Sequence, residues 1–262
     1  MTKASYKNIL RRDRRIILFG LFSVTVMAWH YLSLMAADMN DMAAMGDTMS
    51  KMRIMPWTVV DFGLMLFMWV VMMVGMMLPS ASPMILMFAK INRDQRNKGE
   101  PFVQTGVFVA GYIAVWSAFS LIATVLQLNL QNAGYLSAMM ASTSSTYSGL
   151  AFIAVGVYQW TPLKNACLRH CQTPLSFLMT RWREGTGGAF RMGLSHGAYC
   201  IGCCWGLMVL LFVGGVMNLL WVAAITIFVL AEKFMQPGPW GPRISGGALV
   251  AWGVWIIDLG VQ

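Results

Sequence analysis

Residues 193–208 read GLSHGAYCIGCCWGLM and place one histidine and three cysteines in an apolar run. At about 100° per residue in a helix, His196, Cys200 and Cys203 fall within one narrow arc, and Cys204 lies just off its edge. Thiol and imidazole groups suit soft or borderline metal ions. Close helix packing through the glycines explains part of this pattern, but it does not explain a histidine in an apolar segment. This helix face is therefore the first candidate metal site.

The whole chain has the composition of a membrane protein. Its 262 residues have a mean hydropathy of +0.62, with 58% hydrophobic and only 11% charged residues. Apolar runs long enough to cross a bilayer as helices recur along it, so we expect an all-α, polytopic transmembrane helix bundle. About seven spans are predicted, and a bundle of six, with the last segment at the interface, is the main alternative. The spans cover residues 16–35, 57–89, 102–128, 147–160, 188–213, 217–231 and 244–259.

The basic residues orient this predicted bundle. Of the 19 Lys and Arg residues, all except Lys51 and Arg53 fall on one side of the predicted spans. Because cytoplasmic loops carry an excess of Lys and Arg, we expect a cytoplasmic N-terminus. The net charge of +9 is explained by this bias, so membrane lipid is an expected partner and nucleic acid is not. The chain then consists of a basic cytoplasmic segment, residues 1–15, and a single membrane domain, residues 16–262.

Methionine is concentrated first in a predicted external loop, residues 36–56. There Met39, Met42, Met45 and Met49 recur at steps of three or four, which makes a sulfur stripe if the segment is helical. Thioether ligands select Cu(I) over harder ions, so the stripe is a candidate for metal capture. The alternative is an amphipathic helix on the membrane surface that uses methionine as an adaptable apolar face.

A second group of methionines lies inside the second predicted span. Met72 and Met76 share one helical face with Asp61, and residues 78–84, LPSASPM, follow with two prolines. Prolines at this spacing predict a kinked or broken helix, which often lines a binding site in membrane proteins. For the methionines the alternative is core packing. Asp61 is a candidate intramembrane polar residue, unless it lies at the outer boundary of the span.

The third cluster lies between the fourth and fifth predicted spans. Cys167 and Cys171 are one helical turn apart, and His170 is adjacent to Cys171. The charge bias places this segment in the cytoplasm, where thiols stay reduced. Two thiols and an imidazole beside basic residues make a candidate soft-metal acceptor. The alternative is a pair of unrelated cysteines at the end of a helix.

Four segments, in their order along the chain, resemble an uncharacterised bacterial family of predicted metal-binding integral membrane proteins. They are residues 69–84 (WVVMMVGMMLPSASPM), 162–175 (PLKNACLRHCQTPL), 193–208 and 212–222 (FVGGVMNLLWV). The resemblance covers nearly everything from Trp57 to the C-terminus. It implies a multi-pass protein of the bacterial inner (plasma) membrane and a bound metal, without implying a reaction. The ligands it implies are Cys167, His170, Cys171, His196, Cys200, Cys203 and Cys204.

These observations predict an integral membrane protein that binds a soft metal, with Cu(I) first and zinc or iron as other candidates. It is expected to act in metal transport, sensing or delivery to a membrane metalloenzyme, with a metallochaperone or that enzyme as partner. The alternative is a subunit of a membrane redox complex whose Cys/His cluster holds a redox metal or carries out thiol chemistry. No catalytic residue is predicted. The metal, the direction of transport, the oligomeric state and the number of sites are left open.

Overall fold

The computed structural model describes residues 3–44, 57–96, 103–136, 142, 144–235 and 240–261. Within these ranges the chain forms helices and no strand, which confirms the all-α prediction. The helices are α1 (Lys3–Ala44), α3 (Val59–Ser80), α4 (Ser82–Arg96), α5 (Thr105–Asn132), α6 (Ser145–Gln159), α7 (Pro162–Gln172), α8 (Pro174–Arg181), α9 (Gly185–Val209), α10 (Leu211–Gly214), α11 (Leu219–Phe234) and α12 (Trp240–Val261).

Four helical segments of the described chain are long and apolar enough to cross a membrane. They are Arg12–Asp38 within α1, Val59–Ser80, Thr105–Asn132, and Gly185–Gly214, which joins α9 and α10. The remaining predicted spans correspond to α6, α11 and α12, of which α6 and α11 have 15 and 16 residues. The number of about seven spans and the cytoplasmic N-terminus therefore remain predictions.

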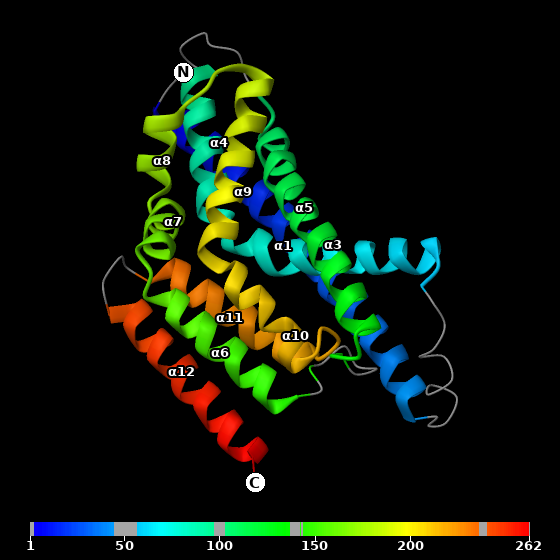
Figure 1. Ribbon diagram of the computed structural model, residues 1–262. Coiled ribbons are helices and arrows are strands. Elements are labelled where there is room, and N and C mark those ends of the chain that lie inside the picture. The colour runs from blue at the N-terminus through cyan, green and yellow to red at the C-terminus, as the bar shows by residue number, and fades with distance from the viewer. Residues whose placement is uncertain are drawn as a thin grey trace.

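The second predicted span, residues 57–89, is divided into two helices. Helix α3 ends at Ser80, just after Pro79, and α4 begins at Ser82 with Pro83 in its first turn. The two helices run in clearly different directions (Figure 1). A proline lacks the amide hydrogen that continues a helix and its ring collides with the preceding turn, so two of them in five residues break the helix. The predicted break is confirmed.

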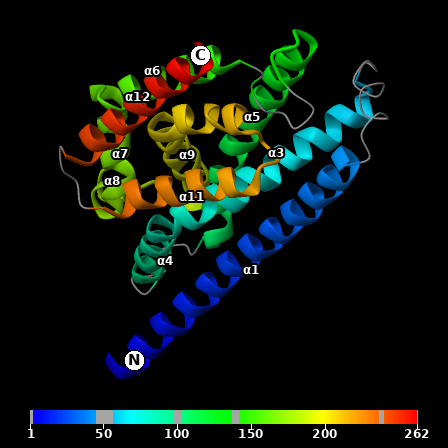
Figure 2. The ribbon, with the colours of Figure 1, turned by 90° about the horizontal axis from the view of Figure 1, so that it is seen from below.

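The helices pack largely in pairs. Helix α5 lies along α9, α6 along α12, and α1 along α3, while the short α7 packs against α9. Figure 2 shows α1 as a long helix along one edge of the molecule, with α9 and α11 further inside. The N-terminal half of α3 extends toward this edge, whereas its C-terminal end, at Met77 and Leu78, is buried in the core.

Glycines set the close approach of α5 and α9. A Cβ atom at Gly193 would clash with the Phe108 carbonyl oxygen, and one at Gly111 would clash with the Phe190 carbonyl oxygen. Both contacts are with backbone, so neither helix can yield by turning a side chain. The pair therefore depends on glycine at both positions, as is common where membrane helices touch.

Changing Gly193 to alanine is expected to lower the free energy of unfolding by about 1–3 kcal/mol, because α5 and α9 must separate to admit the new methyl group. Thermal unfolding of the purified protein in detergent measures this change. Gly63 in α3 is the matched control, since its Cβ would meet nothing within 4 Å. Gly63→Ala should be neutral or slightly stabilising. Equal melting temperatures for the two variants would contradict the packing described.

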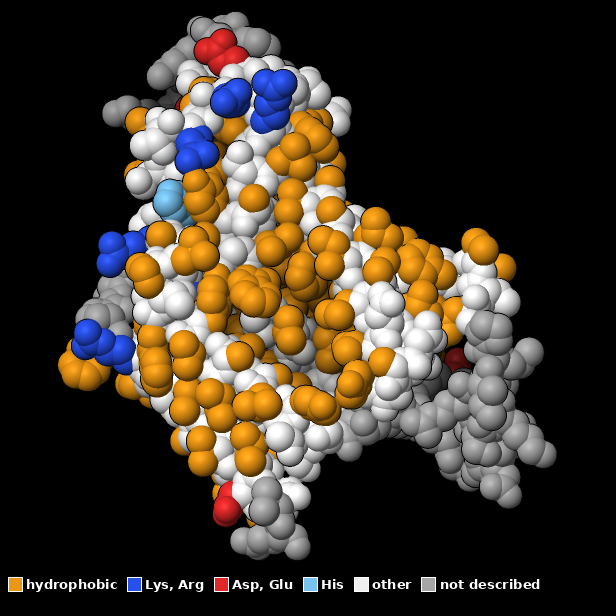
Figure 3. Space-filling model, in the orientation of Figure 1, with side chains coloured by type: hydrophobic (Ala, Val, Ile, Leu, Met, Phe, Trp, Pro, Cys, Tyr) orange, Lys and Arg blue, Asp and Glu red, His pale blue; other side chains and the backbone are white. Residues whose placement is uncertain are grey.

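Charged and apolar side chains are segregated on the surface. Figure 3 shows apolar side chains over the body of the helices, while Lys and Arg gather at one end and along one edge of this face. That end is also where Figure 1 places the N-terminus. Such segregation is typical of helices that face lipid and end in water.

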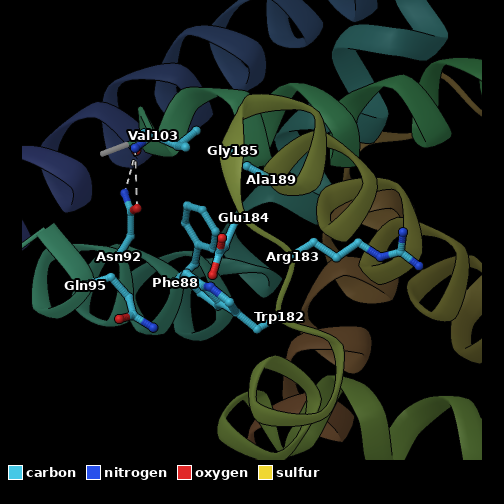
Figure 4. Close-up of a pocket in the computed structure, with 9 residues that line it drawn as sticks. All are labelled: Phe88, Asn92, Gln95, Val103, Trp182, Arg183, Glu184, Gly185 and Ala189. Atoms are coloured by element: carbon cyan, nitrogen blue, oxygen red, sulfur yellow. Dashed lines mark hydrogen bonds between the residues drawn. The ribbon is translucent and has the colours of Figure 1, made fainter. Parts of the chain in front are cut away.

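Two hydrogen bonds of one side chain join α4 to the segment that directly precedes α5. Asn92 donates to the Val103 carbonyl oxygen and accepts from the Val103 amide, as the dashed lines in Figure 4 show. The cleft beside these hydrogen bonds, which Phe88 and Trp182 help to line, has a volume of about 20 Å³. That volume holds about one water molecule, so the cleft is not a ligand site.

Candidate metal centre

Five sulfur-bearing side chains meet where α3, α7 and α9 come together, and we call them the sulfur cluster. The Sγ atoms of Cys171 and Cys203 are 4.0 Å apart, and the Cys204 Sγ is 4.0 Å from the Met77 Sδ. The Cys200 thiol lies within hydrogen-bonding reach of Cys171, Cys203 and Cys204. All members are buried except Cys171, which is half-buried. Helical periodicity explains why residues 200, 203 and 204 share one side of α9, as predicted.

A buried lysine from α11 touches the centre of the sulfur cluster. The Lys233 Nζ lies 2.9 Å from the Cys200 Sγ and 2.8 Å from the Ser80 Oγ. A buried ammonium group is costly unless an opposite charge accompanies it. The thiolate form of Cys200 supplies that charge, and a neighbouring lysine in turn favours the thiolate, the form that binds metals. The contact thus places a group that can stabilise a Cys200 thiolate directly beside its sulfur.

Tyr112 of α5 completes the polar surroundings of Cys200. Its hydroxyl oxygen is 3.1 Å from the Cys200 Sγ and 3.1 Å from the Met77 carbonyl oxygen. The thiols of Cys203 and Cys204 both donate to the Cys200 carbonyl oxygen, at 3.1 and 2.8 Å. The Tyr112 and Lys233 contacts therefore position the Cys200 sulfur, whereas the two thiol hydrogen bonds position its backbone carbonyl.

The two cysteines of α7 differ from Cys200 in charge. Hydrogen bonds shared with Cys200 and then Cys203, together with burial, raise the pKa of the Cys171 thiol well above its usual range. Burial, followed by the proximity of Cys203, also raises the pKa of the Cys167 thiol. Both are therefore neutral thiols at pH 7. Of these two, Cys171 belongs to the sulfur cluster, whereas Cys167 packs beside Gly202 on the neighbouring turn of α9.

The two histidines of the implied ligand set lie beside the sulfur cluster. His196 packs its ring between Tyr112, at 5.5 Å, and Phe177, at 5.7 Å between centroids. Its buried Nδ1 has no hydrogen-bond partner among the described residues. The His170 Nδ1 is 2.8 Å from the Ala166 carbonyl oxygen, and its ring stacks on Tyr199 at 4.3 Å. The structure therefore brings four of the seven implied ligands together and leaves Cys167, His170 and His196 around them.

The methionines of α3 form a continuous buried face. Met72 and Met76 have no exposed surface, nor do Met68 and Met73. The methionine that contacts a cysteine is Met77, at the end of this face. In the predicted outer stripe, Met39 and Met42 lie within α1, and Met45 and Met49 lie outside the described residues.

Asp61 has a local structural role. It is exposed at the start of α3, where its Oδ2 accepts from the Thr58 amide at 2.9 Å and from the Thr58 hydroxyl at 2.7 Å. The Thr58 side chain accepts from the Asp61 amide in return, which completes a capping box. The carboxylate is thus satisfied at the helix end, far along α3 from Met77.

Sequence reasoning missed the two buried lysines. The charge bias treated Lys164 and Lys233 as cytoplasmic surface charges, but Lys164 is 1% and Lys233 is 9% exposed. Lys164 instead pairs with both carboxylate oxygens of Glu232, each at 2.7 Å. The available signal was the Glu232-Lys233 pair, which lies in the last turn of the apolar helix α11. Tyr112 and Met77 carried no signal that separated them from core residues.

The donor set suits a soft ion. At a metal–sulfur distance of about 2.3 Å, two sulfurs 4.0 Å apart subtend roughly 120° at an ion between them, the angle of trigonal coordination. Thiols and a thioether favour Cu(I) over harder metals. Among the described residues, no three His, Cys, Asp or Glu side chains are already arranged to enclose a metal ion. The donors are neighbours, and enclosing an ion would require them to move closer together.

The fold and the sulfur cluster define a helical protein with membrane-length helices and a buried set of soft donors. Residues 66–256 match the family model described as PpoB2, copper chaperone. The chain belongs to this family, and its function is related to copper. The match falls within the region of the predicted resemblance, which began at Trp57. No curated protein and no solved structure matches the chain.

Proposed function

We propose that this protein is a membrane copper chaperone that binds Cu(I) as cargo at the sulfur cluster and passes it to an acceptor. The observation that carries the proposal is the buried contact of 2.9 Å between the Lys233 Nζ and the Cys200 Sγ. It supports a preformed thiolate in an apolar core, and the other four sulfurs of the cluster surround it. The copper chaperone family supplies independent support for the metal.

Charge favours a monovalent ion at this position. The Cys200–Lys233 pair is neutral overall, so bound Cu(I) adds one positive charge to the site, whereas Zn²⁺ or Fe²⁺ adds two. In an apolar interior such an uncompensated charge is expensive. The neutral thiols of the sulfur cluster and the Met77 thioether add soft donors without adding charge. Cu(I) is therefore the proposed cargo, ahead of zinc and iron.

The methionine face of α3 gives the cargo a proposed route. Met68, Met72 and Met76 follow one another along this buried face toward Met77. Exchange between successive thioethers would keep the ion coordinated, because a bare charge in an apolar core is prohibitively costly. In this proposal Met39, Met42, Met45 and Met49 capture the ion outside, and a membrane metalloenzyme or a metallochaperone accepts it. The bacterial inner membrane and a cytoplasmic N-terminus belong to the same proposal.

Anaerobic titration of the purified protein with Cu(I) tests the site. Cys200→Ser should weaken copper binding by more than the roughly 10–100-fold that loss of an outer partner costs, since it removes the thiolate itself. Cys167→Ser is the matched control: it is the same substitution on a cysteine outside the sulfur cluster, and it should leave the affinity unchanged. Equal affinity in the Cys200 variant and the wild type would reject the proposed site.

Thiol redox chemistry is a second candidate function, favoured by the contact of Cys171 with Cys203 across two helices. Mild oxidation followed by peptide mass mapping separates the two functions. A disulfide that forms readily and does not change in yield when Cu(I) is bound would favour redox chemistry. Protection of both thiols by one equivalent of Cu(I) would favour copper binding.

A further inference from the structure

A large cavity lies between α7, α11 and α12, on the side of α7 that faces away from the sulfur cluster. Its volume is about 1370 Å³, above the usual range for a small-molecule site of about 300–1,000 Å³. Helix α7 contributes Arg169 and Gln172 to it, α11 contributes Phe228 and Glu232, and α12 contributes Arg243. Copper binding uses none of these side chains.

The charge around this cavity is positive. Its one carboxylate, Glu232, is neutralised by Lys164, whose ammonium group contacts both carboxylate oxygens. Arg243 lies over the ring of Trp240, at 5.8 Å from its centroid, and this contact does not cancel its charge. In the described part of the chain neither Arg169 nor Arg243 makes a salt bridge. Two uncompensated guanidinium groups therefore flank the cavity, and such groups recognise phosphate well.

The rest of the lining is largely apolar. Phe228 and Ala231 of α11 face Ile244 and Ala248 of α12 across the cavity. The same two helices also expose large apolar side chains, among them Ile227 and Trp252, as lipid-facing helices do. An occupant must therefore combine an anionic head near the two arginines with an apolar body between the helices.

We propose that this cavity binds an anionic phospholipid, with its phosphate at Arg169 and Arg243 and its acyl chains between α11 and α12. Free phosphate shares the head-group chemistry, but it would leave the apolar walls uncovered. Basic pockets between membrane helices are known to hold such head groups. The bound lipid would pack against α7 on the side opposite the sulfur cluster.

Delipidated protein in detergent tests this proposal with three probes: phosphatidylglycerol, phosphatidylcholine with the same acyl chains, and inorganic phosphate. Binding is measured by native mass spectrometry, and the melting temperature is followed in parallel. Phosphatidylglycerol should bind and raise the melting temperature, and the other two should not. Arg169→Gln/Arg243→Gln should bind phosphatidylglycerol about 25-fold more weakly, because each arginine contributes about fivefold.

Arg12→Gln/Arg15→Gln is the matched control, since it removes the same charge from two exposed arginines outside the cavity. It should bind phosphatidylglycerol as the wild type does. All four arginines are exposed, so both double variants should keep the melting temperature of the lipid-free wild type. If a double variant does not fold, the single variants allow the same comparison of phosphatidylglycerol binding. Three results would overturn the proposal: phosphatidylcholine binds as tightly as phosphatidylglycerol, inorganic phosphate raises the melting temperature as much, or the control variant loses as much phosphatidylglycerol affinity as the cavity variant.

Discussion

Replacing Cys200 by alanine should destabilise the metal-free protein by about 3–5 kcal/mol, a large fraction of the stability of a typical domain. The cause is the Lys233 ammonium group, which remains buried while its partner is lost. The Ser80 hydroxyl, at 2.8 Å, still accepts a hydrogen bond from it but carries no charge. Unfolding in detergent, followed by circular dichroism in the absence of copper, measures the loss.

The double variant Cys200→Ala/Lys233→Met separates charge from packing. It removes both members of the pair, so it should recover most of the lost stability, because a buried ion pair replaced by apolar groups is often neutral. Cys167→Ala should change stability much less, since it removes a thiol without leaving a charge. A double variant that is no more stable than Cys200→Ala would show that Cys200 acts through packing alone.

Changing Glu232 to glutamine is expected to cost a similar amount, about 3–5 kcal/mol. Lys164 is almost completely buried, and both of its 2.7 Å contacts are with the two carboxylate oxygens of Glu232. Glutamine keeps the size of the side chain and removes only the charge. The unfolding assay used for Cys200 measures the change.

A matched comparison for Glu232 is the pair of Arg93 and Asp13, which links α4 to α1 and is partly exposed, at 21% and 30%. Asp13→Asn should cost about 1 kcal/mol or less, because water screens an exposed pair. Equal losses of stability in Glu232→Gln and Asp13→Asn would contradict the prediction that the buried Lys164 charge depends on Glu232.

The fold was largely predictable where a single local rule decides it. The apolar runs predicted helices, and Pro79 and Pro83 predicted the break between α3 and α4, which the structure has. The rule for the break is local because a proline disrupts the turn that contains it. The bounds of α6 and α11 also lie within three residues of the predicted spans 147–160 and 217–231, but helices of 15 and 16 residues do not by their length alone establish that they cross a membrane.

The sulfur cluster was predictable along one helix and not between helices. Periodicity brought Cys200, Cys203 and Cys204 to one side of α9, but it could not show which residues of other helices face them. Met72 and Met76 were chosen from a stripe in which Met77 makes the contact with Cys204. The two choices differ by one residue along the helix, and the face that α3 turns toward Cys204 is fixed by its packing against α1, α5 and α11.

The distribution of Lys and Arg along the sequence did not show which lysines are buried. A basic residue near the end of an apolar helix has the same sequence signature whether it faces water or turns inward. Lys233 turns inward because Cys200 and Ser80 accept its hydrogen bonds, and Lys164 does so because Glu232 lies opposite. Each partner lies more than 30 residues away in the sequence, so the pairing depends on tertiary structure.

X-ray absorption spectroscopy at the copper edge, on protein loaded with one equivalent of Cu(I), tests the sulfur cluster most directly. The expected spectrum is that of Cu(I) with two or three sulfur neighbours at about 2.3 Å and no nitrogen or oxygen in the first shell. Cys200→Ser should lose this sulfur shell, and Cys167→Ser should keep it. A first shell of nitrogen or oxygen in the wild type, or the same sulfur shell in the Cys200 variant, would contradict the assignment of this cluster as the copper site.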